Sequence, residues 1–435
     1  MAGTLFNAVM AVALLLLAWG FAQFVLSYRW GTAELRDALA RGPAEPHGSY
    51  DVVFLIACLD EAEVIAETVA ALGRLETRAT VIVVDDGSSD RTADLASAEG
   101  AVVVRRSLPA ARLGKGPALN AGYRKLLALA KRRKLDPART IVCVLDADGR
   151  LSENAVAEVL ERFDDPSVGG VQLPVRIRNT RRFLSRMQDF EFWGMSAIAQ
   201  MARNRTQSVS LGGNGQFTRL AALQSVGERP WSDALTEDLD LGLELTLRGW
   251  SLACAPTAWV SQQGVETVRA LVRQRTRWYQ GHMLCAGKAR QLWESEVVPR
   301  PTALETTVYL LTPSFVMLPW SIAFTLGLAY FAVGLAGGGT VPLDGTDVSV
   351  AVYALFWYVL TFLPPVALAV LYARRSEGEQ LSAALVKGHV LVFYAYLNMV
   401  ASWRALVRIA LGRSGWQKTG RVSEETPASE LRRAA

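Results

Sequence analysis

Two carboxylates stand at the end of an apolar run in the stretch TIVCVLDADGR, residues 140–150. The run from Ile141 to Leu145 is rich in β-branched residues and stops at a polar break, which predicts a buried parallel strand ending in a loop. Asp146 and Asp148 follow, and residues two apart on extended backbone point the same way, so we expect both carboxylates to face one spot. At about 6–7 Å they would repel by about 2–3 kcal/mol at an effective dielectric of about 20, and a hard cation such as Mg²⁺ converts that repulsion into binding. For an isolated Asp-x-Asp, an ordinary strand and turn is the alternative.

More strands and helices alternate before this motif. Apolar, strand-like runs at residues 51–58, 79–84 and 101–104 alternate with helix-like stretches, which is typical of βαβ units and a parallel sheet. In such sheets ligands bind beyond the carboxyl ends of the strands. The acidic residues at those ends are Asp60, Asp85, Asp86, Asp146 and Asp148. Because five acids on one edge need cationic or hydrogen-bonding partners, we predict that this edge is the functional site.

Three further segments carry groups suited to the same edge. Lys115 lies in a basic, glycine-flanked loop before a predicted helix. Residues 211–217, LGGNGQF, predict a turn where backbone approaches something closely, although a purely structural turn is the alternative. Thr236 suits a helix N-cap, and Glu237 and Asp238 suit the first turn, which describes any ordinary helix start. An aspartate there, if it faces the edge, could also remove a proton from an acceptor hydroxyl.

A predicted amphipathic helix near residue 275 carries a third set of groups. Gln274, Arg277 and Trp278 are spaced i, i+3 and i+4 and therefore share one face. A guanidinium can hold a diphosphate through two hydrogen bonds, and an indole offers a flat surface to a sugar ring. A tryptophan packed in the core beside a surface arginine is the alternative.

Composition excludes several classes of site. The 46 basic and 41 acidic residues leave a net charge of only +5, which argues against a nucleic-acid partner. The four cysteines have no C-x-x-C spacing and are expected to be buried, reduced thiols. The three histidines are scattered, so no zinc site is predicted. No strand is followed by G-x-G-x-x-G, which argues against a Rossmann oxidoreductase.

An uncharged stretch near the beginning predicts a membrane anchor. Residues 5–26 carry no charge and are long enough for about 30 Å of hydrocarbon. The basic start and the cleavage site of a signal peptide are both missing from this segment. Arg29, Arg36 and Arg41 follow, so the positive-inside rule places the next domain in the cytoplasm.

The last third of the sequence returns to membrane-like composition. Residues 307–334 are uncharged and divided by two prolines, so the first part is expected at the interface and the rest across the membrane, and residues 350–372 are expected to cross back. Residues 381–411 contain Lys387 and Arg404, and a charge at the membrane centre costs about 2.5–3.5 kcal/mol. We therefore expect an interfacial or re-entrant helix there.

Four motifs occur in a fixed order between the predicted membrane segments: Asp85-Asp86-Gly87-Ser88, Asp146-Ala147-Asp148, Thr236-Glu237-Asp238 and Gln274-x-x-Arg277-Trp278. Together they resemble the membrane-embedded family 2 glycosyltransferases, the group that contains cellulose, hyaluronan and poly-N-acetylglucosamine synthases. The resemblance covers about residues 51–281. It implies an α/β domain of the GT-A type, Rossmann-like with a mostly parallel sheet, that lies in the cytosol at the plasma membrane and is flanked by transmembrane and interfacial helices.

The resemblance also implies a role for each matching residue in an inverting transfer from a nucleotide-sugar, usually a UDP-sugar. The donor-binding set would be Asp60, Asp85, Asp86, Lys115, Asp146, Asp148 and Arg277, with Asp146 and Asp148 holding the diphosphate through Mg²⁺ or Mn²⁺. Asp238 would be the general base, and Glu237, Gln274 and Trp278 would bind the acceptor. The chemistry agrees, because a metal and an arginine stabilise the charged leaving group and an attacking alcohol needs a base.

Two features depart from the family pattern. The glycine turn reads Gly213-Asn214-Gly215 and continues to one arginine, Arg219, where many relatives have a small residue between the glycines and two arginines after them. The predicted transmembrane segments are also few for a polymer-secreting channel. Residues 416–421, WQKTGR, resemble the cytosolic gating loop of such synthases, and a basic tail on the lipid surface is the alternative.

The expected organisation is an anchor at residues 1–30, a GT-A domain at 48–285, interfacial and transmembrane helices at 286–412, and a basic cytosolic tail at 413–435. The leading hypothesis is a processive synthase of a β-linked polysaccharide. One alternative adds one or a few sugars to a lipid acceptor, and another is a non-catalytic, nucleotide-sugar-binding scaffold. Expected partners are a nucleotide-sugar donor, a glycan or lipid-linked acceptor and the lipid bilayer, with room for export or assembly proteins.

Overall fold

The computed structural model describes residues 2–44, 50–75, 79–338, 340–343 and 346–413. Within these residues the chain forms two compact units. The sheet unit comprises residues 41–179 and 209–265. The helical unit comprises residues 1–40, 180–208 and 266–415. The proposed gating loop and the basic tail beyond Arg413 lie outside the described residues, so both remain predictions.

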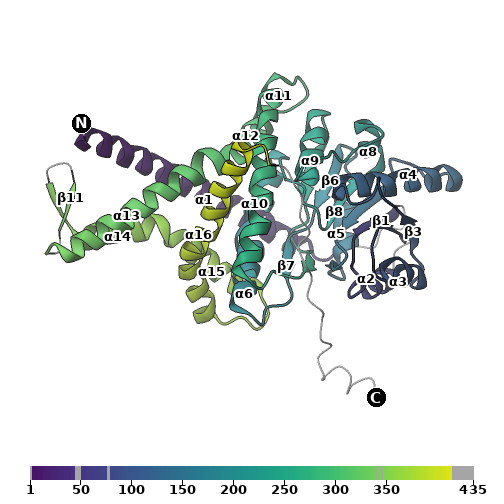
Figure 1. The fold of residues 1–435 in the computed structure, drawn as a ribbon, viewed down its shortest axis with the longest axis horizontal. Helices are drawn as coiled ribbons and strands as arrows, with labels where there is room; N and C mark the ends of the chain where they lie inside the picture. Colours follow the sequence, from purple (N-terminus) through teal and green to yellow (C-terminus); the bar gives the residue numbers. More distant parts are fainter. Residues whose placement is uncertain (1, 45–49, 76–78, 339, 344–345, 414–435) are drawn as a thin grey trace, which may run out of the picture. The chain divides into compact units, whose positions relative to one another are not determined.

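A seven-stranded sheet with the order β3-β2-β1-β4-β8-β6-β9 forms the centre of the sheet unit (Figure 1). β8 runs antiparallel to its neighbours β4 and β6, and the other adjacent pairs are parallel. The mostly parallel sheet is therefore confirmed, whereas the antiparallel β8 was not predicted. The strands are β1 (Asp51–Cys58), β2 (Ala79–Asp85), β3 (Val102–Arg105), β4 (Thr140–Leu145), β6 (Val168–Gln172), β8 (Gln216–Arg219) and β9 (Ser251–Cys254).

Helices pack on both faces of this sheet because its central strands are apolar on both sides. On one face of β1, Phe54 packs in the same buried cluster as Ile65 of α2 (Ile65–Gly73). On the other face, Leu55 meets α4 (Lys115–Arg133) so closely that a Cβ added at Gly122 would lie 2.3 Å from Leu55 Cδ1. The remaining helices of this unit are α3 (Thr92–Ala98), α5 (Ala155–Arg162), α8 (Leu220–Val226) and α9 (Glu237–Leu247).

A second, three-stranded sheet with the order β5-β10-β7 supports the loop after β4. β10 (Val260–Gln262) pairs antiparallel with β5 (Arg150–Leu151) and parallel with β7 (Val175–Ile177). Since β5 begins directly after the Asp-x-Asp-Gly turn, this pairing fixes the far end of that turn.

The helical unit consists almost entirely of helices, several of them apolar. By length and composition, the described residues contain two helices able to cross a membrane, 300–336 and 381–410, and a pair bent by 46° that would make a third. Its elements are α1 (Ala2–Arg41), α6 (Phe183–Asp189), the π-helix η1 (Phe190–Ser196), α7 (Ala197–Arg203), η2 (Asn204–Thr206), α10 (Val268–Cys285), η3 (Ala286–Lys288), α11 (Ala289–Glu294), α12 (Arg300–Thr312), η4 (Pro313–Met317), α13 (Leu318–Ala336), β11 (Thr340–Leu343), β12 (Thr346–Ser349), α14 (Val350–Thr361), α15 (Leu363–Arg375) and α16 (Leu381–Ala410).

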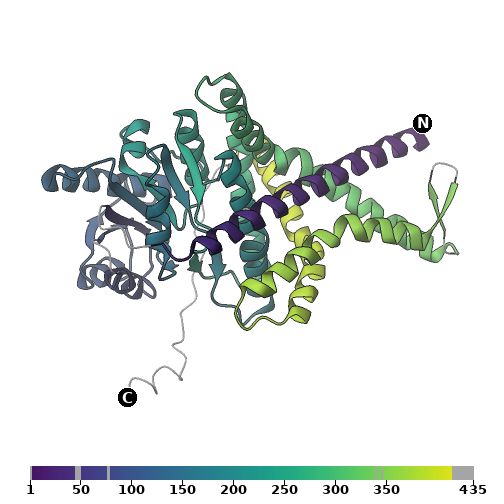
Figure 2. The same ribbon diagram turned by 180° about the vertical axis from the view of Figure 1, so that it is seen from behind.

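The segment expected to be interfacial or re-entrant is the single continuous helix α16. A re-entrant segment would turn back within the membrane, so a 30-residue unbroken helix does not match that alternative. Figures 1 and 2 show α16 running crosswise to α13 and α14, which lie alongside each other. By length and composition α16 could also cross a membrane, so the interfacial position remains a prediction.

The other membrane expectations have mixed outcomes. Residues 2–41 form one helix, α1, as an N-terminal anchor requires, and the anchor itself remains a prediction. The stretch at 307–334 begins in α12, passes through the π-helical turn η4 at Pro313 and continues in α13. The expected return span is broken into α14 and α15. All four cysteines are buried and none forms a disulfide, as expected for reduced thiols.

Candidate functional site

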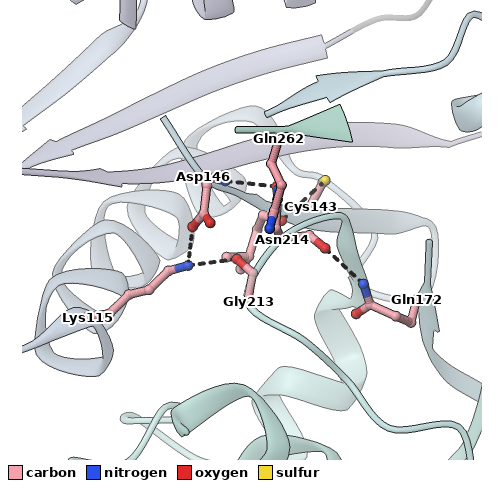
Figure 3. Close-up of polar contacts among 8 residues, drawn as sticks. Lys115, Cys143, Asp146, Gln172, Gly213, Asn214 and Gln262 are labelled. Atoms are coloured by element: carbon pink, nitrogen blue, oxygen red, sulfur yellow. Dashed lines mark hydrogen bonds and ion pairs between the residues drawn. The ribbon is translucent and has the colours of Figure 1, made fainter. Parts of the chain in front are cut away.

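Lys115 lies at the centre of the candidate site, at the first position of α4. Its Nζ donates to Asp146 Oδ1 at 2.6 Å and to the Gly213 carbonyl at 2.6 Å (Figure 3). Burial alone would lower the pKa of Lys115, but the carboxylates of Asp146, Glu237 and Asp238 raise it above the ordinary value. One ammonium is therefore held among three carboxylates, and it stays charged.

Gly213 shows how closely the glycine turn approaches the same group. A Cβ added there would lie 2.9 Å from Lys115 Nζ and 3.2 Å from Asp238 Oδ2. The sequence predicted that backbone approaches something closely at this turn, and the neighbours are the lysine and the predicted base. Gly116 makes a similarly close approach, because an added Cβ would lie 2.1 Å from the Ser232 carbonyl oxygen. Glycines therefore allow the start of α4 and the segment that leads into α9 to meet.

The Asp-x-Asp motif adopts a turn rather than extended backbone. β4 ends at Leu145, and the Gly149 N–H donates to the Asp146 carbonyl at 2.8 Å. The premise that the two carboxylates point the same way on extended backbone was therefore wrong. Asp148 is fully buried, and its Oδ2 accepts the backbone N–H of Gln263 at 2.8 Å. The turn thus directs Asp146 toward Lys115 while Asp148 is anchored at the end of β10.

Arg178 also holds the Asp-x-Asp turn. Its Nη1 donates to the Asp148 carbonyl at 2.6 Å and to the Ser261 carbonyl at 3.2 Å. No motif in the sequence predicted this role for Arg178. The position directly after a short strand, β7, beside the Asp-x-Asp turn, becomes visible only once the small sheet is formed.

The acids at the ends of β1 and β2 organise a neighbouring loop. Asp60 Oδ1 accepts the N–H and the hydroxyl of Ser89 at 2.7 and 3.0 Å, and Asp85 Oδ1 accepts the Ser88 N–H at 3.1 Å. Asp86 forms an ion pair with Arg106. Because β1 lies between β2 and β4 and runs parallel to both, these acids share the sheet edge with Asp146, as predicted.

Asp86 is buried, and its pKa is shifted as a result. Burial raises the pKa of Asp86 above the ordinary value of 3.8, and Arg106 and Arg112 act in the opposite direction. Arg112 also donates to the Gly87 carbonyl at 2.7 Å. The two arginines of the loop after β3 therefore accompany the Asp-Asp-Gly-Ser motif, a pairing that the sequence did not suggest.

The third predicted set lies on α10, in the helical unit. Gln274, Arg277 and Trp278 share one face of this helix, as their spacing predicted. The Trp278 ring lies 6.1 Å from the ring of Phe192, centroid to centroid, and the Arg275 guanidinium lies 4.4 Å from the Trp278 centroid. The part these residues take in the reaction remains a prediction.

A buried network that sequence reasoning missed supports this part of α10. Glu191, on the π-helix η1, accepts from Arg275 Nη2 at 2.7 Å, from the Tyr394 hydroxyl at 2.9 Å and from Asn398 Nδ2 at 3.2 Å. Burial would lower the pKa of Arg275, but Glu191 raises it above the ordinary value. A π-helical insertion often marks a functional segment, and its residues bring α10 and α16 together around one carboxylate.

The donor atoms at the sheet edge are of the type that a hard divalent cation takes. Among the described residues, no group of three or more His, Cys, Asp or Glu side chains forms a ready-made metal site. Mg²⁺ commonly takes one or two carboxylates and completes its shell with substrate phosphates and water. Asp146 and Asp148 supply two such carboxylates, and the Lys115 ammonium against Asp146 marks a position where positive charge is already stabilised.

Comparisons with known proteins agree with this geometry. The family model described as "Glycosyl transferase family group 2" matches residues 141–372, and the model described as "Glycosyl transferase family 2" matches residues 53–224. A beta-monoglucosyldiacylglycerol synthase of Trichormus variabilis is 32% identical over 293 residues, covering 62% of this chain and 58% of the relative. A poly-beta-1,6-N-acetyl-D-glucosamine synthase of Staphylococcus aureus is 31% identical over 261 residues, covering 58% of this chain and 60% of the relative.

The matches therefore span less than two thirds of the length of either relative. Among solved structures, the mannosyltransferase PcManGT from Pyrobaculum calidifontis, in complex with GDP-Man and Mn²⁺, has a TM-score of 0.55 at 18% identity and covers 89% of this chain and 99% of that one. This likeness shows the fold, and the first family model covers more than half of the chain. The chain belongs to glycosyl transferase family group 2, and its sheet unit has the GT-A fold.

Proposed function

We propose that this glycosyltransferase inverts the anomeric centre as it transfers a sugar from a UDP-sugar to the hydroxyl of a growing β-linked polysaccharide. The observation that carries the proposal is the convergence of Asp146, Lys115, Gly213 and Asp238. It brings a donor-binding carboxylate, a cation and a candidate base to one sheet edge. The sheet unit is proposed to face the cytoplasm, where nucleotide-sugars are made.

The proposed mechanism follows from charge. Asp238 accepts the proton of the acceptor hydroxyl, whose oxygen attacks the anomeric carbon on the face opposite the nucleotide. The glycosyl–phosphate bond breaks and leaves a nucleoside diphosphate. Lys115 and Arg277 stabilise its charge, because cations aimed at developing negative charge act most strongly in a site that excludes water.

A divalent cation, Mg²⁺ or Mn²⁺, would be held by Asp146 and Asp148. When bound, it supplies further positive charge to the diphosphate. Asp60, Asp85 and Asp86 are proposed to hold the nucleoside, and Glu237, Gln274 and Trp278 the acceptor. In the proposed reaction the Lys115 ammonium turns from Asp146 to the diphosphate oxygens, so the carboxylate becomes available to the cation.

The acceptor has a second candidate, because two relatives of near-equal identity point to different products. One is named for a glucosyldiacylglycerol and the other for a polysaccharide. The small number of apolar helices among the described residues favours addition of one sugar to a lipid, whereas the complete Gln-x-x-Arg-Trp motif favours a polysaccharide. Gel filtration of labelled product separates the two: only low-mass, lipid-extractable product would replace the polysaccharide proposal by the lipid one.

Asp238→Asn is the central test of the proposed reaction. The full-length membrane protein is incubated separately with four donors, and the released nucleotide is measured. The donors are UDP-glucose, UDP-N-acetylglucosamine, UDP-glucuronate and GDP-mannose. We expect Asp238→Asn to lower turnover by about 10²–10⁴-fold while UDP binding, measured by calorimetry, survives. Asp233→Asn is the matched control, because that exposed carboxylate pairs only with exposed Arg229 among the contacts described for it.

Two outcomes would contradict the proposal. Wild-type turnover in Asp238→Asn would remove the base from this position. A wild-type protein that binds UDP but turns over none of the four donors would favour the non-catalytic scaffold.

A further inference from the structure

Asn214, in the middle of the glycine turn, uses every polar group of its side chain. It is 5% exposed. Its Oδ1 accepts the Asp146 N–H at 3.1 Å, and its Nδ2 donates to Gln262 Oε1 at 2.8 Å (Figure 3). Its backbone carbonyl accepts from Gln172 Nε2 at 2.8 Å. A buried amide with both ends bonded holds its surroundings in one arrangement.

These bonds connect two halves of the candidate site. On one side, Asn214 holds the backbone of Asp146, the carboxylate proposed for the cation. On the other side, the preceding residue, Gly213, accepts from Lys115 and lies against Asp238. Asn214 therefore determines where the Asp146 loop lies relative to the lysine and the base.

An asparagine is suited to this position by its length and its two-sided polarity. A serine side chain would be shorter and has no N–H donor. An alanine would leave the Asp146 N–H and the Gln262 amide oxygen without this partner. Leaving buried polar groups unmet costs more than the bond itself contributes. The packing is close as well, because a Cβ added at Gly149 would lie 2.9 Å from Asn214 Oδ1.

We propose that Asn214 is a positioning residue that aligns the Asp146 carboxylate, which would hold a divalent cation. The inference rests on the proposed function, and it gives a role to a residue that the sequence marked only as a departure from the family pattern. Asn214 acts through Asp146 and the glycine turn, so its effect should appear in the part of nucleotide binding that depends on the cation.

The test measures UDP affinity of the full-length protein twice, with Mn²⁺ and with EDTA. We expect Asn214→Ala to weaken UDP binding about tenfold with Mn²⁺ and less than twofold with EDTA. Asn214→Asp keeps an oxygen for the Asp146 N–H, and the Gln262 amide can turn its nitrogen toward the new carboxylate. We therefore expect Asn214→Asp to recover most of the Mn²⁺-dependent affinity.

Gln172→Leu is the matched control. Gln172 holds the same turn through the Asn214 carbonyl and the Gly212 N–H, but not the Asp146 backbone. Gln172→Leu should lower the melting temperature without changing the ratio of the UDP affinity with Mn²⁺ to that with EDTA. An unchanged ratio in Asn214→Ala, or an equal change in Gln172→Leu, would overturn the inference and leave Asn214 as a purely structural residue. Because the measurement is UDP binding, it tests the role of Asn214 even if the protein transfers no donor sugar.

Discussion

Each unit buries a charged side chain among polar partners, but the signs of the charges are reversed between the two units. In the helical unit, one carboxylate, Glu191, is met by a guanidinium, a hydroxyl and an amide. In the sheet unit, one ammonium, Lys115, is bonded to the Asp146 carboxylate and is further stabilised electrostatically by Glu237 and Asp238. The first arrangement satisfies its charge with protein groups alone. The second gathers negative charge where a cation and a diphosphate are proposed to bind. The two clusters therefore differ in the balance of their partners rather than in burial.

The largest effect is expected from breaking the satisfied pair. Glu191→Leu leaves Arg275 buried without its carboxylate, which should lower the free energy of unfolding by about 3–5 kcal/mol. Replacing both partners, as Glu191→Leu with Arg275→Met, should recover much of that loss because no charge remains unpaired. Chemical unfolding in detergent measures both. A single variant that costs less than about 1 kcal/mol would contradict the structural reading of this pair.

Removing the central cation of the sheet unit should have the next largest effect. Lys115→Met takes away the only ammonium bonded to Asp146 among the described contacts, so we expect turnover to fall by about 100-fold. With the lysine gone, Mn²⁺ alone should raise the melting temperature more in the variant than in the wild type. Lys387→Met, which breaks the Lys387–Glu379 pair of the helical unit, is the control. An equal response to Mn²⁺ in wild type and Lys115→Met would argue against a cation position beside Asp146.

A smaller change tests the geometry without removing a charge. Gly213→Ala adds a Cβ 2.9 Å from Lys115 Nζ and 3.2 Å from Asp238 Oδ2. Both contacts are ends of side chains that can shift, so the fold should survive while turnover falls by about tenfold, or about 1.4 kcal/mol. Gly73→Ala is the control, since a Cβ there meets nothing within 4 Å. Equal turnover in the two variants would show that the close approach at Gly213 does not matter for the reaction.

The smallest effect concerns pH and Asp86. Because burial raises the pKa of Asp86 above 3.8, its protonation favours the folded state. That contribution is complete below the ordinary pKa and is lost as pH rises through the raised one. Asp86→Asn does not titrate, so its melting temperature minus that of the wild type should increase as the pH rises above the ordinary pKa of 3.8. A difference that is flat or decreases with pH would reverse the sign assigned to Asp86.

Much of the sheet unit could be predicted because its signals are local. Runs of β-branched residues marked β1, β2 and β4, and the acids after them marked the edge where parallel strands end. Lys115 was visible in a basic loop between two glycines, and the turn at Gly213 in a run dense in glycine. Helical spacing alone placed Gln274, Arg277 and Trp278 on one face of α10. In each case the physical cause lies within a few residues of the signal.

Tertiary structure decided what local patterns do not contain. The antiparallel strand β8 enters the sheet between β4 and β6, although its residues follow a turn and precede a helix. Asn214 meets the Asp146 N–H across 68 positions, and Tyr394 meets Glu191 across 203. These residues are ordinary polar positions in the sequence. Their roles arise because a buried polar group must find a partner wherever the folded chain brings one, and sequence spacing carries no information about contacts that distant.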